Sequence, residues 1–225
     1  MSRLKHPPLC MMALALAWVA LPSTSRAGTI TVYSNFGAGN SYDCCNAYTE
    51  SGAGSFTGFN ALQAMAFTNA TGQNLTLTQI DIAESFVTGN NSMTLNLYAD
   101  NAGVPGAVLE SWTVNNLPDL GTCCAVATVF DSAGVVLLNG ATYFIAPASD
   151  DVTWEAWNWN TIGMSGAGAI STDVGATWVP GPYDPNGAFD VLGKSAVPEP
   201  SGVLLTGTGL IGILVGLHLA LRRAS

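Results

Sequence analysis

Basic residues are missing from most of this chain. The six Lys and Arg residues and both His residues lie outside the block from Gly28 to Gly193. Of the 15 Asp and Glu residues only Glu199 lies outside it, so the block holds 14 carboxylates and a formal charge of −14. Nucleic-acid binding depends on Lys and Arg contacts to phosphates, and we therefore expect no nucleic-acid partner. An acidic surface without cations keeps a protein soluble and self-repelling.

The absence of histidine from this block excludes several kinds of catalytic and metal site. Ser-His-Asp and Cys-His mechanisms need an imidazole to accept a proton, and many zinc, copper and iron sites use imidazole ligands. The remaining options are an oxygen-ligated cation such as calcium, or a pair of carboxyl groups acting on a glycosidic bond. We expect no enzymatic activity and no resident cofactor.

Long helical periodicity is also lacking between Gly28 and Leu192. Short runs of alternating apolar and polar residues are interrupted by Gly, Asn, Asp and Pro, which is typical of strands and turns. About ten short strands at this spacing predict an all-β fold, an antiparallel β-sandwich of the jelly-roll or Greek-key type. We expect the strands around 30–34, 64–68, 75–83, 92–98, 108–114, 125–130, 135–138, 141–146, 152–157 and 189–192.

Two local patterns add detail to this prediction. In LTLTQIDIA the apolar positions change phase between Leu77 and Ile80, which predicts a bulge near Gln79. In VVLLNGATYFIA the dipeptide Asn139-Gly140 is typical of a tight primed turn. It predicts a hairpin between two apolar strands.

The first 27 residues have the features of a secretory signal peptide. Arg3 and Lys5 precede an apolar stretch at 9–21, and Ser25-Arg26-Ala27 places small residues where a signal peptidase reads them. We expect cleavage before Gly28 and export of the rest. The alternative is an uncleaved anchor, but about 13 apolar residues are few for roughly 30 Å of hydrocarbon.

The exported block contains two adjacent cysteine pairs, Cys44-Cys45 and Cys123-Cys124. An even number of cysteines in an exported chain is typical of disulfides. A bond between neighbouring cysteines is strained, so we expect cross-links between the two pairs. Each would close a loop of about 80 residues and contribute roughly 4 kcal/mol. The competing interpretation is a four-cysteine zinc site.

The C-terminal residues have the features of a membrane span. Residues 201–221 contain no Asp, Glu, Lys or Arg, and as a helix they would extend about 31 Å, which matches the hydrocarbon core. Arg222 and Arg223 follow, and the positive-inside rule places this end in the cytoplasm. A linker at 193–200 precedes the span, because Pro198 and Pro200 are incompatible with helix and central strand.

The order of these features resembles a known sorting signal. Val197-Pro198-Glu199-Pro200, the apolar span and Arg222-Arg223 together resemble the PEP-CTERM sorting domain of exported bacterial proteins. The resemblance implies recognition by an exosortase, a membrane transpeptidase that cuts near Pro-Glu-Pro and releases the protein toward the cell surface or the exopolysaccharide matrix. It covers 197–223 only, and the alternative is a permanent tail anchor.

The exported block is similar to the choice-of-anchor β-rich domains found ahead of such signals, with type R as the candidate form. The likeness rests on TVYSNFG at 31–37, LYADNAGVPGAVL at 97–109, NGATYFIA at 139–146 and WNWN at 157–160. Because that family has no established activity, the resemblance implies a fold and a sorting route and supplies no catalytic residues.

Two stretches, YADNAGVPG and DPNGAFD, carry oxygen donors at spacings that a calcium ion can use. The candidate ligands are Asp100, Asp184, Asn186 and Asp190. The same residue types are also ordinary turn formers.

A third stretch, ASDDVTWEAWNWN, combines aromatic and acidic residues as carbohydrate sites do: Trp154, Trp157 and Trp159 with Asp150, Asp151 and Glu155. Strand alternation places Trp157 and Trp159 on one face of a strand. Two interpretations follow: this face binds a sugar ring, or the two side chains are part of the hydrophobic core. A glycosidase would further need two carboxyl groups across a cleft.

Four segments are therefore expected: a signal peptide at 1–27, an exported β-sandwich domain at 28–192, a linker with Pro-Glu-Pro at 193–200, and a single transmembrane helix with a basic tail at 201–225. We expect an exported bacterial structural or adhesive protein, held in the inner membrane with a cytoplasmic C-terminus and then delivered to the surface or matrix. Its expected partners are signal peptidase, exosortase, the membrane and exopolysaccharide. The alternatives are a carbohydrate-binding module and a carboxylate-dependent glycosidase.

Overall fold

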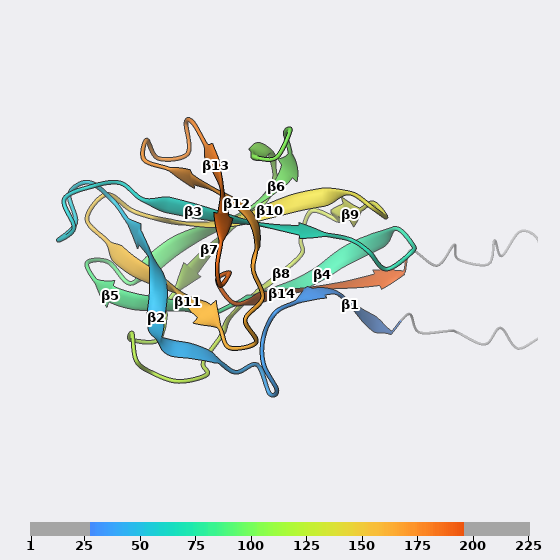
Figure 1. The fold of residues 1–225 in the computed structure, drawn as a ribbon, viewed down its shortest axis with the longest axis horizontal. Coiled ribbons are helices and arrows are strands. Elements are labelled where there is room, and N and C mark those ends of the chain that lie inside the picture. Colours follow the sequence, from blue (N-terminus) through green and yellow to red (C-terminus); the bar gives the residue numbers. More distant parts are fainter. Residues whose placement is uncertain (1–27, 196–225) are drawn as a thin grey trace, which may run out of the picture.

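The computed structural model of the chain describes residues 28–195, which fold into three antiparallel sheets (Figure 1). The all-β prediction is confirmed. The expected signal peptide, Pro-Glu-Pro motif and transmembrane helix lie outside the described residues. Within 28–195, no helix is long and apolar enough to cross a membrane.

The largest sheet has six strands. Their spatial order is β13 (Val179–Tyr183), β12 (Gly166–Ser171), β3 (Leu62–Thr68), β10 (Thr142–Ser149), β6 (Ser92–Asp100) and β7 (Pro105–Asn115).

The two smaller sheets lie end to end. One contains β1 (Thr29–Ser34), β14 (Phe189–Ser195), β4 (Leu75–Ile82) and β8 (Ala127–Phe130), with β9 (Val136–Leu137) also paired to β4. The other contains β2 (Tyr42–Ser51), β11 (Trp154–Asn160) and β5 (Glu84–Thr88). Ala83 alone separates β4 from β5, and its backbone groups bond to Ala188 and Asn158, which ties the two sheets together.

The main hydrophobic core lies between the six-stranded sheet and the smaller sheets. Met65, Leu95 and Ile145 enter it from the large sheet, and Ile80 and Phe189 enter it from β4 and β14. All five side chains are fully buried. Alternate residues of a strand point to the same face, so the period of two in the sequence becomes a continuous apolar layer, which stabilises the fold by about 25 cal/mol per Å² buried.

The predicted bulge in β4 is confirmed. Leu192 of β14 pairs with Gln79, and the next residue, Gly193, pairs with Leu77. Thr78 is therefore the extra residue on β4. It lets the apolar side chains before and after it point into the same core.

The predicted hairpin at 135–146 is wrong. β9 pairs with β4, whereas β10 pairs with β3 and β6, so the two strands belong to different sheets. The Ala141 N–H donates to the Leu138 carbonyl at 3.1 Å, and only Gly140 of the central dipeptide has a positive φ, at 77°. A primed turn of the expected type needs a positive φ at both positions, so this turn carries the chain from one layer to the other.

Four strands were not predicted, namely β2, β5, β12 and β13. β13 contains Pro180 and Pro182, and it lies at the edge of its sheet. Proline has no N–H to donate to a neighbouring strand, so it is tolerated in an edge strand, which has a neighbour on one side only. β14 also extends to Ser195, so the first residues of the expected linker are in a strand. Lys194 pairs there with Thr29, which brings both ends of the described chain to the same end of the molecule (Figure 1).

Candidate functional site

Three connections meet at the end of the molecule opposite the chain ends (Figure 1). They are the β2–β3 loop (52–61), the β5–β6 turn (89–91) and the β10–β11 turn (150–153). The Gly52 N–H donates to the Thr153 carbonyl at 3.1 Å. The Asn90 N–H donates to Thr153 Oγ1 at 2.8 Å, and Asn90 Nδ2 donates to Asp150 Oδ2 at 2.6 Å. The three connections therefore support one another.

The β2–β3 loop lies in direct backbone contact with the β10–β11 turn. A Cβ atom on Gly52 would stand 2.3 Å from the Asp150 carbonyl oxygen and from Asp151 Cα, so glycine alone fits here. The Gly54 N–H donates to Asp151 Oδ1 at 3.2 Å. These contacts anchor a loop that projects from the sheets.

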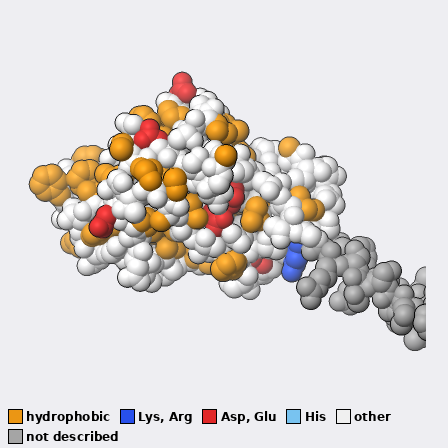
Figure 2. Space-filling view, turned by 90° about the horizontal axis from the view of Figure 1, so that it is seen from below, with side chains coloured by type: hydrophobic (Ala, Val, Ile, Leu, Met, Phe, Trp, Pro, Cys, Tyr) orange, Lys and Arg blue, Asp and Glu red, His pale blue; other side chains and the backbone are white. Residues whose placement is uncertain are grey.

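Hydrophobic side chains are gathered on this projecting loop and its neighbours. We call Phe56, Phe59, Val152 and Trp154 the aromatic tip; the first three are 86%, 53% and 48% exposed. The Phe56 ring stacks on Trp154 with 6.2 Å between centroids and 12° between planes. Figure 2 shows hydrophobic side chains protruding at the end away from the grey chain ends. Exposed apolar clusters are a common feature of interaction surfaces, so the aromatic tip is a candidate site.

The three candidate tryptophans have different surroundings. Trp154 is half-buried under Phe56. Trp157 is fully buried against Phe189, and its Nε1–H donates to the Ala188 carbonyl at 3.1 Å. Trp159 is half-buried and packs against Tyr48, with 5.6 Å between centroids. Trp157 therefore has no face open to a sugar ring, and only Trp154 reaches the tip.

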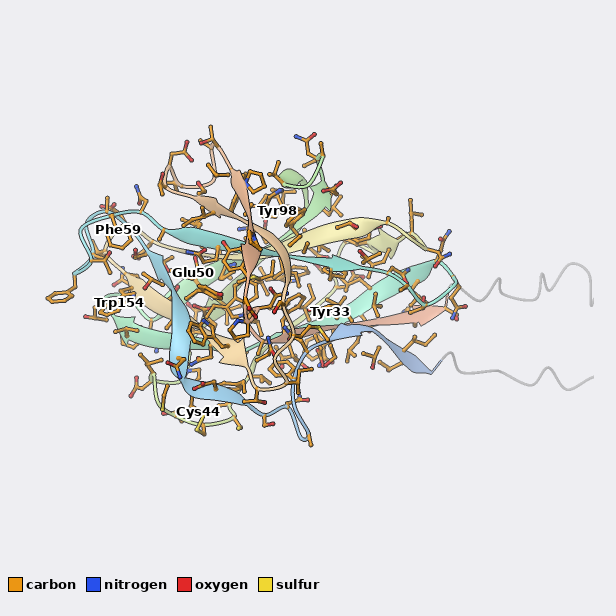
Figure 3. All side chains as sticks on the ribbon, viewed as in Figure 1. Tyr33, Cys44, Glu50, Phe59, Tyr98 and Trp154 are labelled. Carbon is orange, nitrogen blue, oxygen red and sulfur yellow. A yellow bond between two sulfur atoms is a disulfide. The ribbon has the colours of Figure 1, made fainter. Side chains whose placement is uncertain are left out.

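Glu50 lies inside the same end of the molecule, beneath the tip (Figure 3), and two further glutamates lie in the same three-stranded sheet. Glu155 of β11 stands directly opposite Glu50 of β2, and Glu84 of β5 stands opposite Trp157, two residues further along β11. All three therefore point to the inner face of the three-stranded sheet. Each is fully buried, and we call them the glutamate triad.

The triad has few hydrogen bonds. Both carboxylate oxygens of Glu50 accept from the Gln63 N–H at 3.0 Å. Glu155 Oε2 accepts from the Ser149 hydroxyl at 2.6 Å. Within residues 28–195, Glu155 Oε1 and both oxygens of Glu84 have no hydrogen-bond partner.

Burial favours the protonated form of each triad member. Burial raises the pKa of Glu50 well above its ordinary value, and the charges of Glu84 and Glu155 raise it further. Burial and the charge of Glu155 do the same to the pKa of Glu84. Burial raises the pKa of Glu155 to about 7, although the Ser149 hydrogen bond opposes this. A buried carboxyl without a countercharge takes up a proton more readily than one in water.

The carboxyl groups considered for a glycosidase do not converge. Glu155 is fully buried on the inner face, whereas Asp150 and Asp151 are exposed in the turn that precedes β11. Their oxygens accept hydrogen bonds from the neighbouring connections. Asp150 and Asp151 therefore lie at the surface next to the tip, whereas Glu155 lies on the inner face of the sheet.

The calcium candidates lie in different elements. Asp100 ends β6 and accepts from the Gly103 N–H at 2.9 Å, as in an ordinary turn. Asp184 follows β13 and accepts from the Ser165 hydroxyl. Asn186 is buried beside Gly166, and Asp190 lies within β14. No group of three or more His, Cys, Asp or Glu residues within 28–195 is arranged to hold a metal ion.

Asp190 has a carboxylate neighbour across the sheet. It is paired with Asp81 of β4, and the two side chains are 8% and 5% exposed. Burial raises the pKa of Asp190 to about 7, and the Asp81 charge adds to the effect. Burial and the neighbouring carboxylate therefore favour the protonated form of Asp190.

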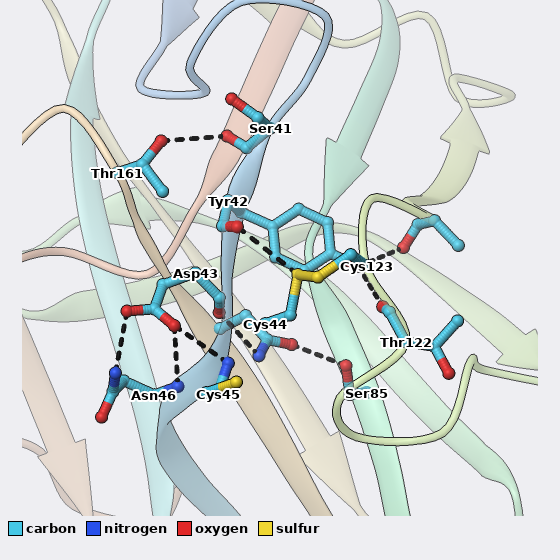
Figure 4. The surroundings of a disulfide bond; sticks show 12 residues. Ser41, Tyr42, Asp43, Cys44, Cys45, Asn46, Ser85, Thr122, Cys123 and Thr161 are labelled. Carbon is cyan, nitrogen blue, oxygen red and sulfur yellow. Dashed lines mark hydrogen bonds between the residues drawn. A yellow bond between two sulfur atoms is a disulfide. The ribbon is translucent and has the colours of Figure 1, made fainter.

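One of the expected cross-links between the cysteine pairs is present. Cys44 is bonded to Cys123, 79 residues along the chain, with 5.3 Å between Cα atoms. Cys45 and Cys124 are exposed free thiols. Figure 4 shows the bond beside Tyr42, whose hydroxyl donates to the Ala125 carbonyl at 2.9 Å. Because the disulfide sulfurs are not thiolates, the four-cysteine zinc site is excluded in this state.

The sequence contains only weak signals for the exposed phenylalanines of the tip and for the buried glutamates, which were not predicted as a site. Phe56 and Phe59 lie in SGAGSFTGFN, a stretch too rich in Gly and Ser to form a strand that would bury them. Glu155 interrupts the apolar run WEAW. Neither signal shows that the phenylalanines and the glutamates come together, because that depends on strand pairing over more than 90 residues.

No protein-family model matches the chain, and no curated protein and no solved structure matches it either.

Proposed function

We propose that this chain is an exported bacterial structural or adhesive protein that makes its contacts through the aromatic tip. The single observation that carries the proposal is the position of the tip. Phe56 and Phe59 project at one end, whereas Thr29 and Lys194, paired with each other, mark the end from which the chain continues in both directions. A domain tethered by its C-terminus therefore presents the tip outward.

The proposed route to the surface rests on the terminal sequences. A signal peptidase removes 1–27, residues 201–225 anchor the chain in the inner membrane with the C-terminus in the cytoplasm, and an exosortase cuts near Pro198-Glu199-Pro200. The Cys44–Cys123 bond supports export, because disulfides persist in oxidising compartments. The two layers around one core support a β-sandwich of the jelly-roll type, the fold expected of choice-of-anchor domains.

A carbohydrate-binding module of the exopolysaccharide matrix is the second candidate. It is favoured by the exposed rings of Phe56 and Phe59 next to the exposed carboxylates of Asp150 and Asp151. Aromatic faces stack on sugar rings, and carboxylates accept hydrogen bonds from hydroxyl groups. Its binding residues would then be those of the tip, with Trp154 and without Trp157.

The test compares the retention of full-length variants in the cell-surface and matrix fractions of a producing strain. The Phe56→Ser/Phe59→Ser variant should be retained about tenfold less than the wild type, because removing a central aromatic contact costs at least about 1.4 kcal/mol of binding. The matched control is Ile162→Ser/Val179→Ser, which removes two hydrophobic side chains that are 51% and 62% exposed outside the tip.

Equal retention of the tip variant and the control would refute an adhesive tip. Digesting the matrix polysaccharide before the assay distinguishes the two candidates. Release of the wild type by digestion supports the carbohydrate-binding module, and continued retention supports a protein partner.

A further inference from the structure

The glutamate triad has no countercharge within reach. Lys194 is the only Lys, Arg or His among residues 28–195. It lies near the far end of β14, where it pairs with Thr29 and Thr76. A buried carboxylate is normally neutralised by a paired cation, and this part of the chain contains none that can serve Glu50, Glu84 or Glu155.

The groups that face the triad from the surrounding strands are neutral or acidic. Gln63 of β3 and Ser149 of β10 donate hydrogen bonds to it. The Tyr183 hydroxyl of β13 donates to Gln63 Oε1 at 2.5 Å. Burial raises the pKa of Tyr183, and the Glu50 charge raises it further. Tyr48 of β2 packs edge-on against Tyr183. Asp150, at the start of the β10–β11 turn, adds a further negative charge near Glu155.

We propose that the glutamate triad is a proton-operated switch, closed when its three carboxyl groups are protonated and loosened when they ionise. In the closed state the three-stranded sheet packs against β3 and β10 with neutral acids between them. Ionisation places up to three like charges in a space without a cation, and the charges reach water only if β2, β5 and β11 move away from the large sheet.

The direction of the pH effect follows from the raised pKa values. The closed state holds protons that the opened, solvated carboxyls release above their ordinary pKa of 4.5. The closed state is therefore fully favoured below about pH 4.5 and loses this advantage as the pH rises through about 7 for Glu155. Glu50 and Glu84, whose pKa values are also raised, act in the same direction. With pKa values of about 7 closed and 4.5 open, Glu155 alone lowers the closed-to-open ratio about 30-fold between pH 5.5 and 8.5.

The consequence for the molecule is local. Ser51 at the end of β2 bonds to Ala61 across the β2–β3 loop, and Thr153 precedes β11. Loosening β2 and β11 therefore also frees the base of the aromatic tip. The switch is a property of these strands and does not depend on the tip being adhesive.

The experiment is hydrogen exchange of the full-length chain in neutral detergent at pH 5.5 and 8.5, corrected for the intrinsic effect of pH on amide exchange. We expect the protection of β2, β5 and β11 to fall at least about 30-fold at the higher pH, while protection of β6 and β7 changes less.

Two variants test the triad directly. Glu84→Met replaces a carboxyl whose oxygens make no hydrogen bond within the described residues, and Glu155→Gln keeps the shape and can still accept from Ser149. Each should reduce the pH dependence of protection. The matched control is Asp119→Asn at an exposed carboxylate, which should leave it unchanged.

Three results would overturn the switch: equal protection of the wild type at both pH values, unchanged pH dependence in both variants, or restoration of protection at pH 8.5 by millimolar calcium and its loss in chelator. The last result would mean that a cation, rather than protons, neutralises the triad.

Discussion

Cys44 and Cys45 are neighbours in the chain but lie in opposite environments. Cys44 is 5% exposed and bonded to Cys123, whereas Cys45 is exposed with a free thiol. Successive side chains of a strand point to opposite faces, so only one member of the pair faces the 116–126 segment. The vicinal pairs therefore provide one cross-link and two accessible thiols, although their number alone suggested two cross-links.

Removing the disulfide should lower the free energy of unfolding by about 4 kcal/mol, because the bond closes a loop of roughly 80 residues in the unfolded chain. Cys44→Ser or Cys123→Ser makes the change, and denaturant unfolding without reductant measures it. Cys45→Ser and Cys124→Ser are the matched controls and should change stability by less than about 0.5 kcal/mol. A loss of similar size in the controls would show that the cysteines pair differently.

The β4–β14 ladder holds two acids side by side. Asp81 accepts hydrogen bonds from Gln79 Nε2 at 2.8 and 3.0 Å and from the Thr128 hydroxyl at 2.5 Å. Asp190 Oδ1 has no partner among the described residues. The pair therefore consists of one buried carboxyl group with several hydrogen-bond donors, Asp81, and one with an unpartnered oxygen, Asp190, whose protonated form is favoured.

Asp190→Asn should stabilise the protein at pH 8 by roughly 2 kcal/mol and have little effect at pH 4. The folded-state pKa of Asp190 is raised from 3.8 to about 7, so the wild type loses stability as the pH rises across that window and the variant does not. Denaturant unfolding at both pH values measures the difference. The control is Asp81→Asn, which changes the other member of the pair but weakens its hydrogen bonds with Gln79 and Thr128. It should therefore stabilise the protein less at pH 8 than Asp190→Asn does. Equal stabilisation by the two variants would contradict this account.

The placement of the chain ends and the tip concerns the whole molecule. The described chain starts and stops beside the same pair of strands, β1 and β14, and Phe59 and Trp154 of the tip lie at the other end (Figure 3). If the C-terminus is anchored in a membrane as proposed, the sheets extend lengthwise from the anchored end to the tip.

Intact-mass analysis of membrane and secreted fractions tests the proposed processing. Both forms should begin at Gly28, and the secreted form should end near Pro198-Glu199-Pro200. Alkylation before reduction should label two cysteines, Cys45 and Cys124, and alkylation after reduction should label two more. A secreted form that retains 201–225, or a cell-associated form that is never shortened, would favour a permanent anchor.

Several properties could be predicted without the fold because they depend on local patterns. Period-two alternation predicted antiparallel strands, and the phase change after Leu77 predicted the bulge at Thr78. The composition excluded imidazole chemistry and internal salt bridges in 28–193. Each of these follows from residues a few positions apart or from simple counts, so no long-range information is needed.

Pairing partners could be known only from the tertiary structure. Asn139-Gly140 favours a turn, but β9 joins β4 and β10 joins β3, so the two strands lie in separate layers. The same long-range pairing buries Trp157, leaves Phe56 exposed above Trp154, and gathers Glu50, Glu84 and Glu155 from strands up to about 100 residues apart. The tip and the triad are consequences of which strands are adjacent, and adjacency is decided by burial across the whole domain.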